Sequence, residues 1–133
     1  AKGYAADEML RLLRDAGFKR ALVAAGGDVA LGDGPPGQAK WRVSLIAGEE
    51  AIEIANGAVS TSGDESQYVV IGGVRYSHIV GPRTGLGGTG APQVSAIAAR
   101  GIEADPLATA AVVRGVAFMK KRFPRVRFVT SPP

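Results

Sequence analysis

AIEIANGAVSTSGDESQYVVIGGVRYSHIV, residues 51–80, is the stretch that decides the fold class. It holds four short runs of mostly apolar or β-branched residues, at 51–54, 58–62, 68–71 and 75–80. A turn sequence follows each run, in order Asn56-Gly57, Gly63-Asp64, Gly72-Gly73 and Gly81-Pro82. Strands joined by such short turns pair in antiparallel fashion. The stretch therefore predicts an antiparallel meander.

Toward the N-terminus, the sequence continues as further strands that follow a helix. Residues 41–46 alternate in character, and residues 20–25 and 29–31 are short apolar runs, so we expect a strand at each. Residues 5–16 place leucines and a methionine at helical spacing among charged residues, and Gly17 is a typical helix stop. This pattern predicts an amphipathic helix with one buried face.

Toward the C-terminus, a glycine-rich loop precedes the last strand and helix. Residues 84–92 include four glycines and form the best candidate for a loop that faces a ligand. We expect a central strand at 93–99, a helix over 105–123 that Pro124 ends, and an edge strand at 126–129. The whole pattern predicts an α+β fold, a mainly antiparallel sheet with two helices on one face.

Composition limits the chain to a single domain and to oxygen-based chemistry. The 133 residues, 46% of them hydrophobic, suffice for one hydrophobic core, so we expect residues 1–133 to form one domain. The sequence has no Cys and one His, which excludes disulfides, thiolate metal sites and cysteine nucleophiles. No apolar stretch reaches the ~18–20 residues of a membrane-spanning helix, so we expect no membrane-spanning segment.

The net charge of +4 comes from one strip near the C-terminus. After Asp105 the chain has six basic residues, all within 114–127, and no acidic one. The other ten basic and twelve acidic residues sum to −2. A basic strip is compatible with an interaction domain, including one for nucleic acid. Because such cations sit favourably near the negative end of the helix dipole, we favour an ordinary solvated helix end and expect no nucleic-acid partner.

Asp105 and Thr109 are the first candidate pair for chemistry. They are four residues apart, so on a helix their side-chain oxygens would project from the same face. Such oxygens suit a hard cation such as Mg²⁺. The alternative is that Asp105 caps the helix, with Pro106 at its first position. Spacing alone favours the cap.

Residues 76–85, Tyr-Ser-His-Ile-Val-Gly-Pro-Arg-Thr-Gly, are the densest polar segment and contain His78. A lone histidine among apolar neighbours is either a hydrogen-bonded structural residue or a catalyst. The Pro-Arg-Thr-Gly turn that follows carries a guanidinium and a hydroxyl group, which suit an anionic ligand. Both interpretations of His78 stay open on the residues alone.

Five segments, read in order, resemble the ApbE-like FAD:protein FMN transferases. They are Lys2-Gly3-Tyr4-Ala5-Ala6-Asp7, Gly26-Gly27-Asp28, Ser60-Thr61-Ser62-Gly63-Asp64, residues 76–85, and Glu103-Ala104-Asp105-Pro106-Leu107-Ala108-Thr109. The resemblance runs from the first residue to about Val113. It implies that the chain is the C-terminal portion of a longer transferase.

The resemblance also implies an activity and a set of site residues. It implies a T-fold-like architecture and a Mg²⁺-dependent reaction in which FAD is cut at its pyrophosphate, FMN passes to a Thr of an acceptor flavoprotein, and AMP leaves. By the matching motifs, Asp105 and Thr109 would hold the metal and Lys2 would contact FAD. His78 and Ile79 would lie along the flavin nucleotide, with His78 as the catalytic residue. The implied location is periplasmic, or outside the membrane on an anchor.

The chain also departs from the family pattern. Gly81 stands where the family usually has Asp, Pro106 replaces the usual Ala, and the loop over residues 86–92 is shorter than usual. The upstream half, expected as a partner, would supply other FAD contacts and an Ala carbonyl that completes the metal site. Two alternatives therefore remain: a degenerate, non-catalytic FAD-binding module, or an interaction module built on the basic strip.

Overall fold

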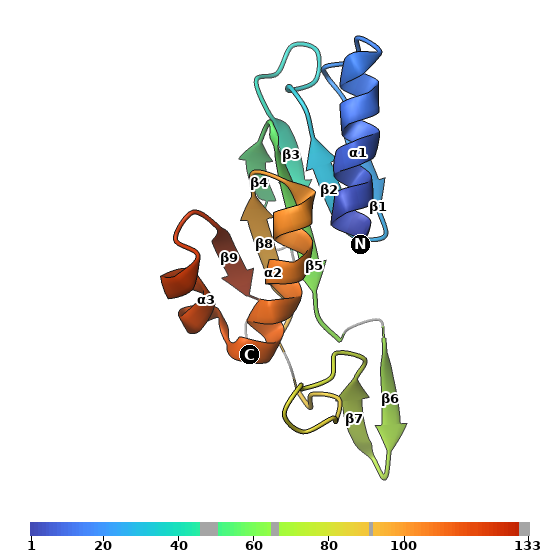
Figure 1. The fold of residues 1–133 in the computed structure, drawn as a ribbon, viewed down its shortest axis with the longest axis vertical. Helices are drawn as coiled ribbons and strands as arrows, with labels where there is room; N and C mark the ends of the chain where they lie inside the picture. Colours follow the sequence, from blue (N-terminus) through green and yellow to red (C-terminus); the bar gives the residue numbers. More distant parts are fainter. Residues whose placement is uncertain (46–50, 65–66, 91, 131–133) are drawn as a thin grey trace.

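The computed structural model describes residues 1–45, 51–64, 67–90 and 92–130 (Figure 1). The elements, in chain order, are α1 (Lys2–Asp15), β1 (Leu22–Ala25), β2 (Asp28–Leu31), β3 (Trp41–Ser44), β4 (Ala51–Ile54), β5 (Gly57–Ser62), β6 (Tyr68–Ile71), β7 (Val74–Ser77), β8 (Val94–Ala98), α2 (Gly101–Arg114), α3 (Val116–Arg122) and β9 (Arg127–Thr130). No helix among these residues is long and apolar enough to cross a membrane.

Five of the strands form one antiparallel sheet in the order β1-β2-β5-β8-β9. The other four strands form two antiparallel ribbons, β3-β4 and β6-β7. The predicted α+β class and the mainly antiparallel pairing are therefore confirmed. β9 lies at one edge of the sheet, as expected for the last strand.

Small side chains line the sheet face that the helices cover. Ala30, Ala58 and Ala98 lie in register across β2, β5 and β8, and all three are buried. Because side chains alternate along a strand, Ser60 and Ala96 share this face with them. α1 and α2 pack side by side on this face, as Figure 1 shows. Alanines and serines let the α2 backbone approach the sheet closely, which places polar groups of α2 within reach of β5.

Larger side chains line the opposite face and meet the β3-β4 ribbon. Leu31 and Val59 of the sheet form a buried cluster with Leu45 and with Ile52 of β4. The β3-β4 ribbon therefore covers this face of the sheet, as the helices cover the opposite face. The predicted strand at 41–46 ends at Ser44, and Ile46 lies outside the described residues.

α2 begins at Gly101, so the expectation that Asp105 caps a helix starting at Pro106 is wrong. The start is set from another helix: the Asp7 carboxylate of α1 accepts the amide hydrogens of Gly101 (2.7 Å) and Ile102 (2.9 Å). The first amides of a helix have no partner within the helix, so a group outside it that accepts their hydrogen bonds favours a helix start at that point. Asp105 therefore lies one turn inside α2, where its carboxylate is free for other partners.

The predicted helix over residues 105–123 is two helices. Gly115 has a φ of 86°, which no L-residue adopts easily, and it separates α2 from α3. α3 packs against α2 and β9 and buries Met119 beside Phe128. The residues that the structure describes thus form three helices rather than the expected two, with α1 and α2 on one face of the sheet.

α1 and α2 cross at a pair of glycines. A Cβ atom placed on Gly3 would lie 2.1 Å from the carbonyl oxygen of Gly101, and one on Gly101 would lie 2.4 Å from that of Gly3. No real Cβ approaches backbone this closely, so only glycine fits at either position. The crossing brings the first residues of α1 against the first turn of α2. α1 begins at Lys2, whereas the sequence predicted a helix start at residue 5.

The β6-β7 ribbon projects away from the sheet as an arm (Figure 1). Its base is braced by Arg75, whose guanidinium lies 3.8 Å from the centre of the Tyr68 ring and 3.7 Å from the Asp64 carboxylate. All four side chains of β6 are exposed. The predicted strand at 75–80 ends at Ser77, so His78 and Ile79 lie in the loop beyond it.

Candidate functional site

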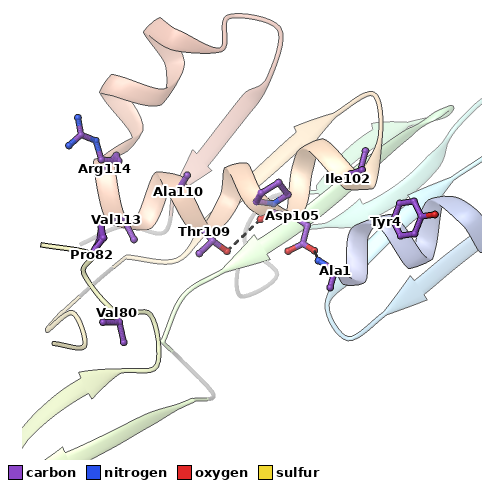
Figure 2. A pocket seen from close by; sticks show the side chains of 11 residues that line it. Ala1, Tyr4, Val80, Pro82, Ile102, Asp105, Thr109, Ala110, Val113 and Arg114 are labelled. Carbon is purple, nitrogen blue, oxygen red and sulfur yellow. Dashed lines mark hydrogen bonds and ion pairs between the residues drawn. The ribbon is translucent and has the colours of Figure 1, made fainter. Parts of the chain in front are cut away.

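A cavity of about 630 Å³ opens between α2, the start of α1 and the loop after β7 (Figure 2). Asp105 and Thr109 line it from α2, and Val80 and Pro82 line it from the loop. The remaining lining residues are Ala1, Tyr4, Ile102, Pro106, Ala110, Val113 and Arg114. The predicted pair thus shares one cavity, whose other lining side chains are apolar except for the Tyr4 hydroxyl group and the Arg114 guanidinium group.

The Asp105 carboxylate binds the start of α1. Its Oδ2 accepts hydrogen bonds from the backbone amide of Gly3 (3.0 Å) and from the amino group of Ala1 (2.9 Å). Burial raises the pKa of Asp105, but these two donors and the charge of Lys2 outweigh it, so the pKa lies below its usual value. Asp105 is therefore an anion at neutral pH, and no hydrogen bond from a described residue reaches its Oδ1.

Thr109 is held against the sheet. Its Oγ1 lies 2.9 Å from the Oγ of Ser62 on β5 and donates a long hydrogen bond of 3.5 Å to the carbonyl oxygen of Asp105 (Figure 2). The four-residue spacing brings Asp105 and Thr109 to one side of α2, as predicted. Ser62 restricts the hydroxyl group of Thr109 to one position.

The oxygen chemistry of this pair fits a small hard cation. One carboxylate and one hydroxyl are the kind of ligands that Mg²⁺ accepts, with the rest of its octahedron left to water and phosphate. Across the described residues there is no group of three or more His, Cys, Asp or Glu side chains that could hold a metal alone. A cation at Asp105 and Thr109 would therefore depend on further oxygens, such as those of a ligand.

His78 lies beside the cavity rather than among the residues that line it. The residues that follow it in the loop, Val80 and Pro82, reach the cavity wall. The backbone amide of His78 donates to the Gln67 carbonyl at 3.2 Å, and its ring Nδ1 lies 2.9 Å from the same oxygen. A carbonyl oxygen can only accept, so Nδ1 carries the proton in the neutral ring. Nε2 is then an exposed base.

Ile79 and Lys2, the other predicted FAD contacts, lie on different elements. The side chain of Ile79 is buried, and its backbone amide donates to the Ser77 hydroxyl at 3.0 Å. Lys2 opens α1, and its side chain is 56% exposed while its Nζ lies 3.6 Å from Asp28. The structure therefore brings Asp105 and Thr109 together in one cavity, with Lys2 near Asp105, whereas His78 and Ile79 lie beside the cavity and do not line it.

Gly81 forms a tight turn with Thr84. Its carbonyl oxygen accepts the Gly85 amide at 2.9 Å and the Thr84 hydroxyl at 3.4 Å. A Cβ atom on Gly81 would lie 3.0 Å from Oγ1 of Thr84 and 3.7 Å from the carbonyl oxygen of Leu86. The turn thus has room for a short side chain if the Thr84 hydroxyl moves by a few tenths of an ångström.

Three polar residues that support the site were missed as functional residues. Asp7, Asp28 and Ser62 occur in the quoted motifs, but no role was predicted for them. Asp7 starts α2, Ser62 holds Thr109, and Asp28 lies under Lys2. Asp28 had one detectable signal, since an acidic residue directly opens an apolar run that reads as a strand.

Comparisons with known proteins agree on one family. The family model described as the ApbE family matches residues 1–126. The chain is 35% identical over 126 residues to the FAD:protein FMN transferase of Klebsiella pneumoniae (strain 342), covering 86% of this chain and 35% of the relative. It is 38% identical over 122 residues to that of Rhodobacter capsulatus, covering 86% of this chain and 23% of the relative.

Solved structures give the same result. The ApbE protein of Thermotoga maritima superposes with a TM-score of 0.86 at 31% identity, over 97% of this chain and 45% of that protein. The flavinyl transferase ApbE of Pseudomonas stutzeri superposes with a TM-score of 0.78 at 31% identity, over 98% of this chain and 46% of that protein. The chain spans about a third of the length of the curated relative from Klebsiella and under half of each of these structures.

Proposed function

The chain belongs to the ApbE family, and on that basis we propose that it is the C-terminal portion of a Mg²⁺-dependent FAD:protein FMN transferase. The reaction would move FMN from FAD to a Thr hydroxyl of an acceptor flavoprotein. The observation that carries the proposal is the cavity in which Asp105 and Thr109 of α2 face the loop that follows His78. The upstream half of the site would come from the part of the relatives that this chain does not match.

In this proposal, the residues divide the work of phosphoryl transfer. Asp105 and Thr109 would hold Mg²⁺, which neutralises negative charge on the pyrophosphate when it is bound. Lys2 and the segment of His78 and Ile79 would bind FAD. The acceptor Thr oxygen attacks the phosphorus on the FMN side, the P–O bond to the AMP phosphate breaks, and AMP leaves with the bonding electrons.

His78 would take the proton in this step. An acceptor hydroxyl group must lose its proton as it attacks phosphorus, and Nε2 of His78, which carries a lone pair when the ring proton is on Nδ1, would accept it. The Gln67 carbonyl keeps the proton of the resting ring on Nδ1, which leaves the lone pair on the exposed side of the ring. A ring held in this tautomer needs no rearrangement before it acts.

Release of AMP and formation of a fluorescent acceptor test the proposal in the full gene product. Asp105→Asn and Thr109→Val should each reduce Mg²⁺-dependent AMP release by at least tenfold, because each removes a predicted metal ligand. Glu103→Gln, an exposed carboxylate on the same helix, is the matched control and should leave the rate unchanged. Equal rates in the absence and presence of a chelator would exclude the metal assignment.

A non-catalytic FAD-binding module is the second candidate, and Gly81 is the residue that favours it. An acidic side chain at this position could orient His78 or the acceptor, and glycine cannot. Gly81→Asp should cost little stability, because only the Thr84 hydroxyl must move. If the protein binds FAD without transferring FMN and Gly81→Asp produces transfer, the chain is a degenerate member. If the unmodified protein transfers FMN, the module is excluded.

A further inference from the structure

Asp28 is a buried carboxylate with one oxygen that lacks a hydrogen bond. It is the first residue of β2, directly after the turn of Gly26 and Gly27, and is 2% exposed. Its Oδ1 accepts the hydroxyl hydrogen of Ser60 on β5, whereas its Oδ2 is buried and makes no hydrogen bond. A carboxylate taken out of water destabilises the fold unless a positive charge compensates it. The compensating charge should therefore lie next to Oδ2.

Lys2 supplies that charge while keeping its side chain half in solvent. Its Nζ lies 3.6 Å from Oδ2 of Asp28, and the side chain is 56% exposed. A Cβ atom on Gly26 would lie 3.0 Å from Cδ of Lys2, so the aliphatic stem of Lys2 rests on the glycine turn. The ammonium group is thus held by a buried anion on one side and remains open to a ligand on the other.

β5 connects Lys2 to the candidate metal pair. Ser60 and Ser62 are two residues apart on one strand, so they share a face and lie about 7 Å apart. Ser60 binds Asp28, the partner of Lys2, and Ser62 binds Thr109. Lys2 and the pair of Asp105 and Thr109 are therefore fixed relative to one another by a single strand.

We propose that Asp28 is a positioning residue, which holds the Lys2 ammonium group where it meets a phosphate of the bound dinucleotide. The inference rests on the proposed function for its ligand, FAD, and adds a role for the glycine turn and its acidic residue. Asp28 itself, under Lys2 and away from solvent, does not touch the ligand. Its effect on binding passes entirely through Lys2.

A purely structural role for Asp28 makes a different prediction. The bond between Asp28 and Ser60 links β2 to β5, and this link alone could account for a buried polar residue. An asparagine at position 28 can still accept the Ser60 hydrogen through its carbonyl oxygen. Asp28→Asn therefore removes the charge that holds Lys2 and keeps the link between the strands.

The test is a double-mutant cycle of FAD affinity, measured by calorimetry in the full gene product. Asp28→Asn and Lys2→Met should each raise the Kd for FAD by about tenfold, as expected for a charge-assisted contact. The Kd of the double variant should be no higher than the higher Kd of the two single variants, because both changes remove the same contact. Asp28→Asn should raise the KM for FAD with much less effect on kcat.

Several results would overturn the inference. One is that Asp28→Asn leaves the Kd for FAD unchanged while Lys2→Met raises it. Another is that the losses of binding free energy in the two single variants simply add in the double variant.

If Asp28→Asn fails to fold, Ser60→Ala replaces it and should weaken FAD binding. Its control is Ser95→Ala, another buried serine, which bonds to Thr61 on the opposite sheet face and should leave the Kd unchanged. Equal effects of the two serine variants would show a structural role. An unmodified protein that does not bind FAD would instead overturn the proposed function, and with it the ligand named here.

Discussion

The role of His78 depends on which nitrogen of its ring carries the proton. The Nδ1 hydrogen bond to Gln67 fixes the ring at an exposed position, where losing one hydrogen bond costs little stability. We expect His78→Ala to slow FMN transfer by about 10²–10⁴-fold, the range of a general base. The melting temperature should change by no more than a few degrees, and both quantities are measured on the same preparation.

His78→Asn is the matched control for this prediction. The asparagine amide can donate to the Gln67 carbonyl as Nδ1–H does, but it has no basic nitrogen. If His78 acts as a base, the asparagine variant should be as slow as the alanine variant. Activity retained in His78→Asn would instead show that the hydrogen bond to Gln67 is what matters.

Asp105 should make the stability of the protein depend on pH. Its pKa in the folded protein lies below the unfolded value of 3.8, because the donors at the start of α1 outweigh the effect of burial. The carboxylate therefore contributes stability that is complete above pH 3.8 and is lost as the pH falls through the lowered pKa. In the 133-residue chain, where the amino group of Ala1 is one of these donors, Asp105→Asn should have the lower melting temperature at pH 7, and the melting temperatures of the two proteins should converge below pH 3.8. A constant difference over that range would exclude this source of stability.

At the scale of the element, the start of α2 depends on a side chain from another helix. Asp7 of α1 accepts the first two amides of α2, so Asp7→Ala leaves both without a partner. We expect a loss of ~0.5–2 kcal/mol in the free energy of unfolding, as for the removal of a helix cap. Urea unfolding with an unchanged m-value measures it. Glu8→Gln, the exposed neighbour on α1, should change the midpoint much less.

Local signals predicted most strands and failed at the helix starts. The runs at 51–54, 58–62 and 68–71 match β4, β5 and β6 closely, because each strand ends at a glycine-containing turn that local sequence specifies. The predicted start of α2 was wrong by four residues, because Asp7, which accepts the first amides of the helix, lies 94 positions away in the sequence. The break at Gly115 was missed because a single glycine within an apolar segment is compatible with either one helix or two.

The candidate site was also predicted only in part from the sequence. The spacing of Asp105 and Thr109 correctly placed both side chains on one side of a helix, and that side lines the cavity. The roles of Asp28 and Ser62 depend on which strands lie side by side, and β2 and β5 are separated in the sequence by the β3-β4 ribbon. No local pattern reports that pairing. The roles assigned to Lys2, His78 and Ile79 came from family resemblance and stay predictions.

At the scale of the whole molecule, the chain matches only part of its relatives' length, and this leads to a prediction about activity. The cavity is open between α2 and the loop after β7, and the 133 residues match about a third of the Klebsiella relative. We expect the 133-residue chain alone to show weak or absent FAD binding and FMN transfer. The two halves together should restore both, measured by FAD titration and acceptor fluorescence. Full transfer by the 133 residues alone would contradict the proposal that a second half is needed.

The exposed arm has a practical consequence for handling the protein. β6 presents Tyr68, Val69, Val70 and Ile71 to solvent, between 50% and 63% exposed, and its only strand partner among the described residues is β7. A β-rich apolar segment without charge, in a ribbon with open edges, is a template for pairing with another chain. Expression of these 133 residues is therefore prone to aggregation at high concentration, and the yield of soluble material would be governed by the arm rather than by the sheet that carries the site.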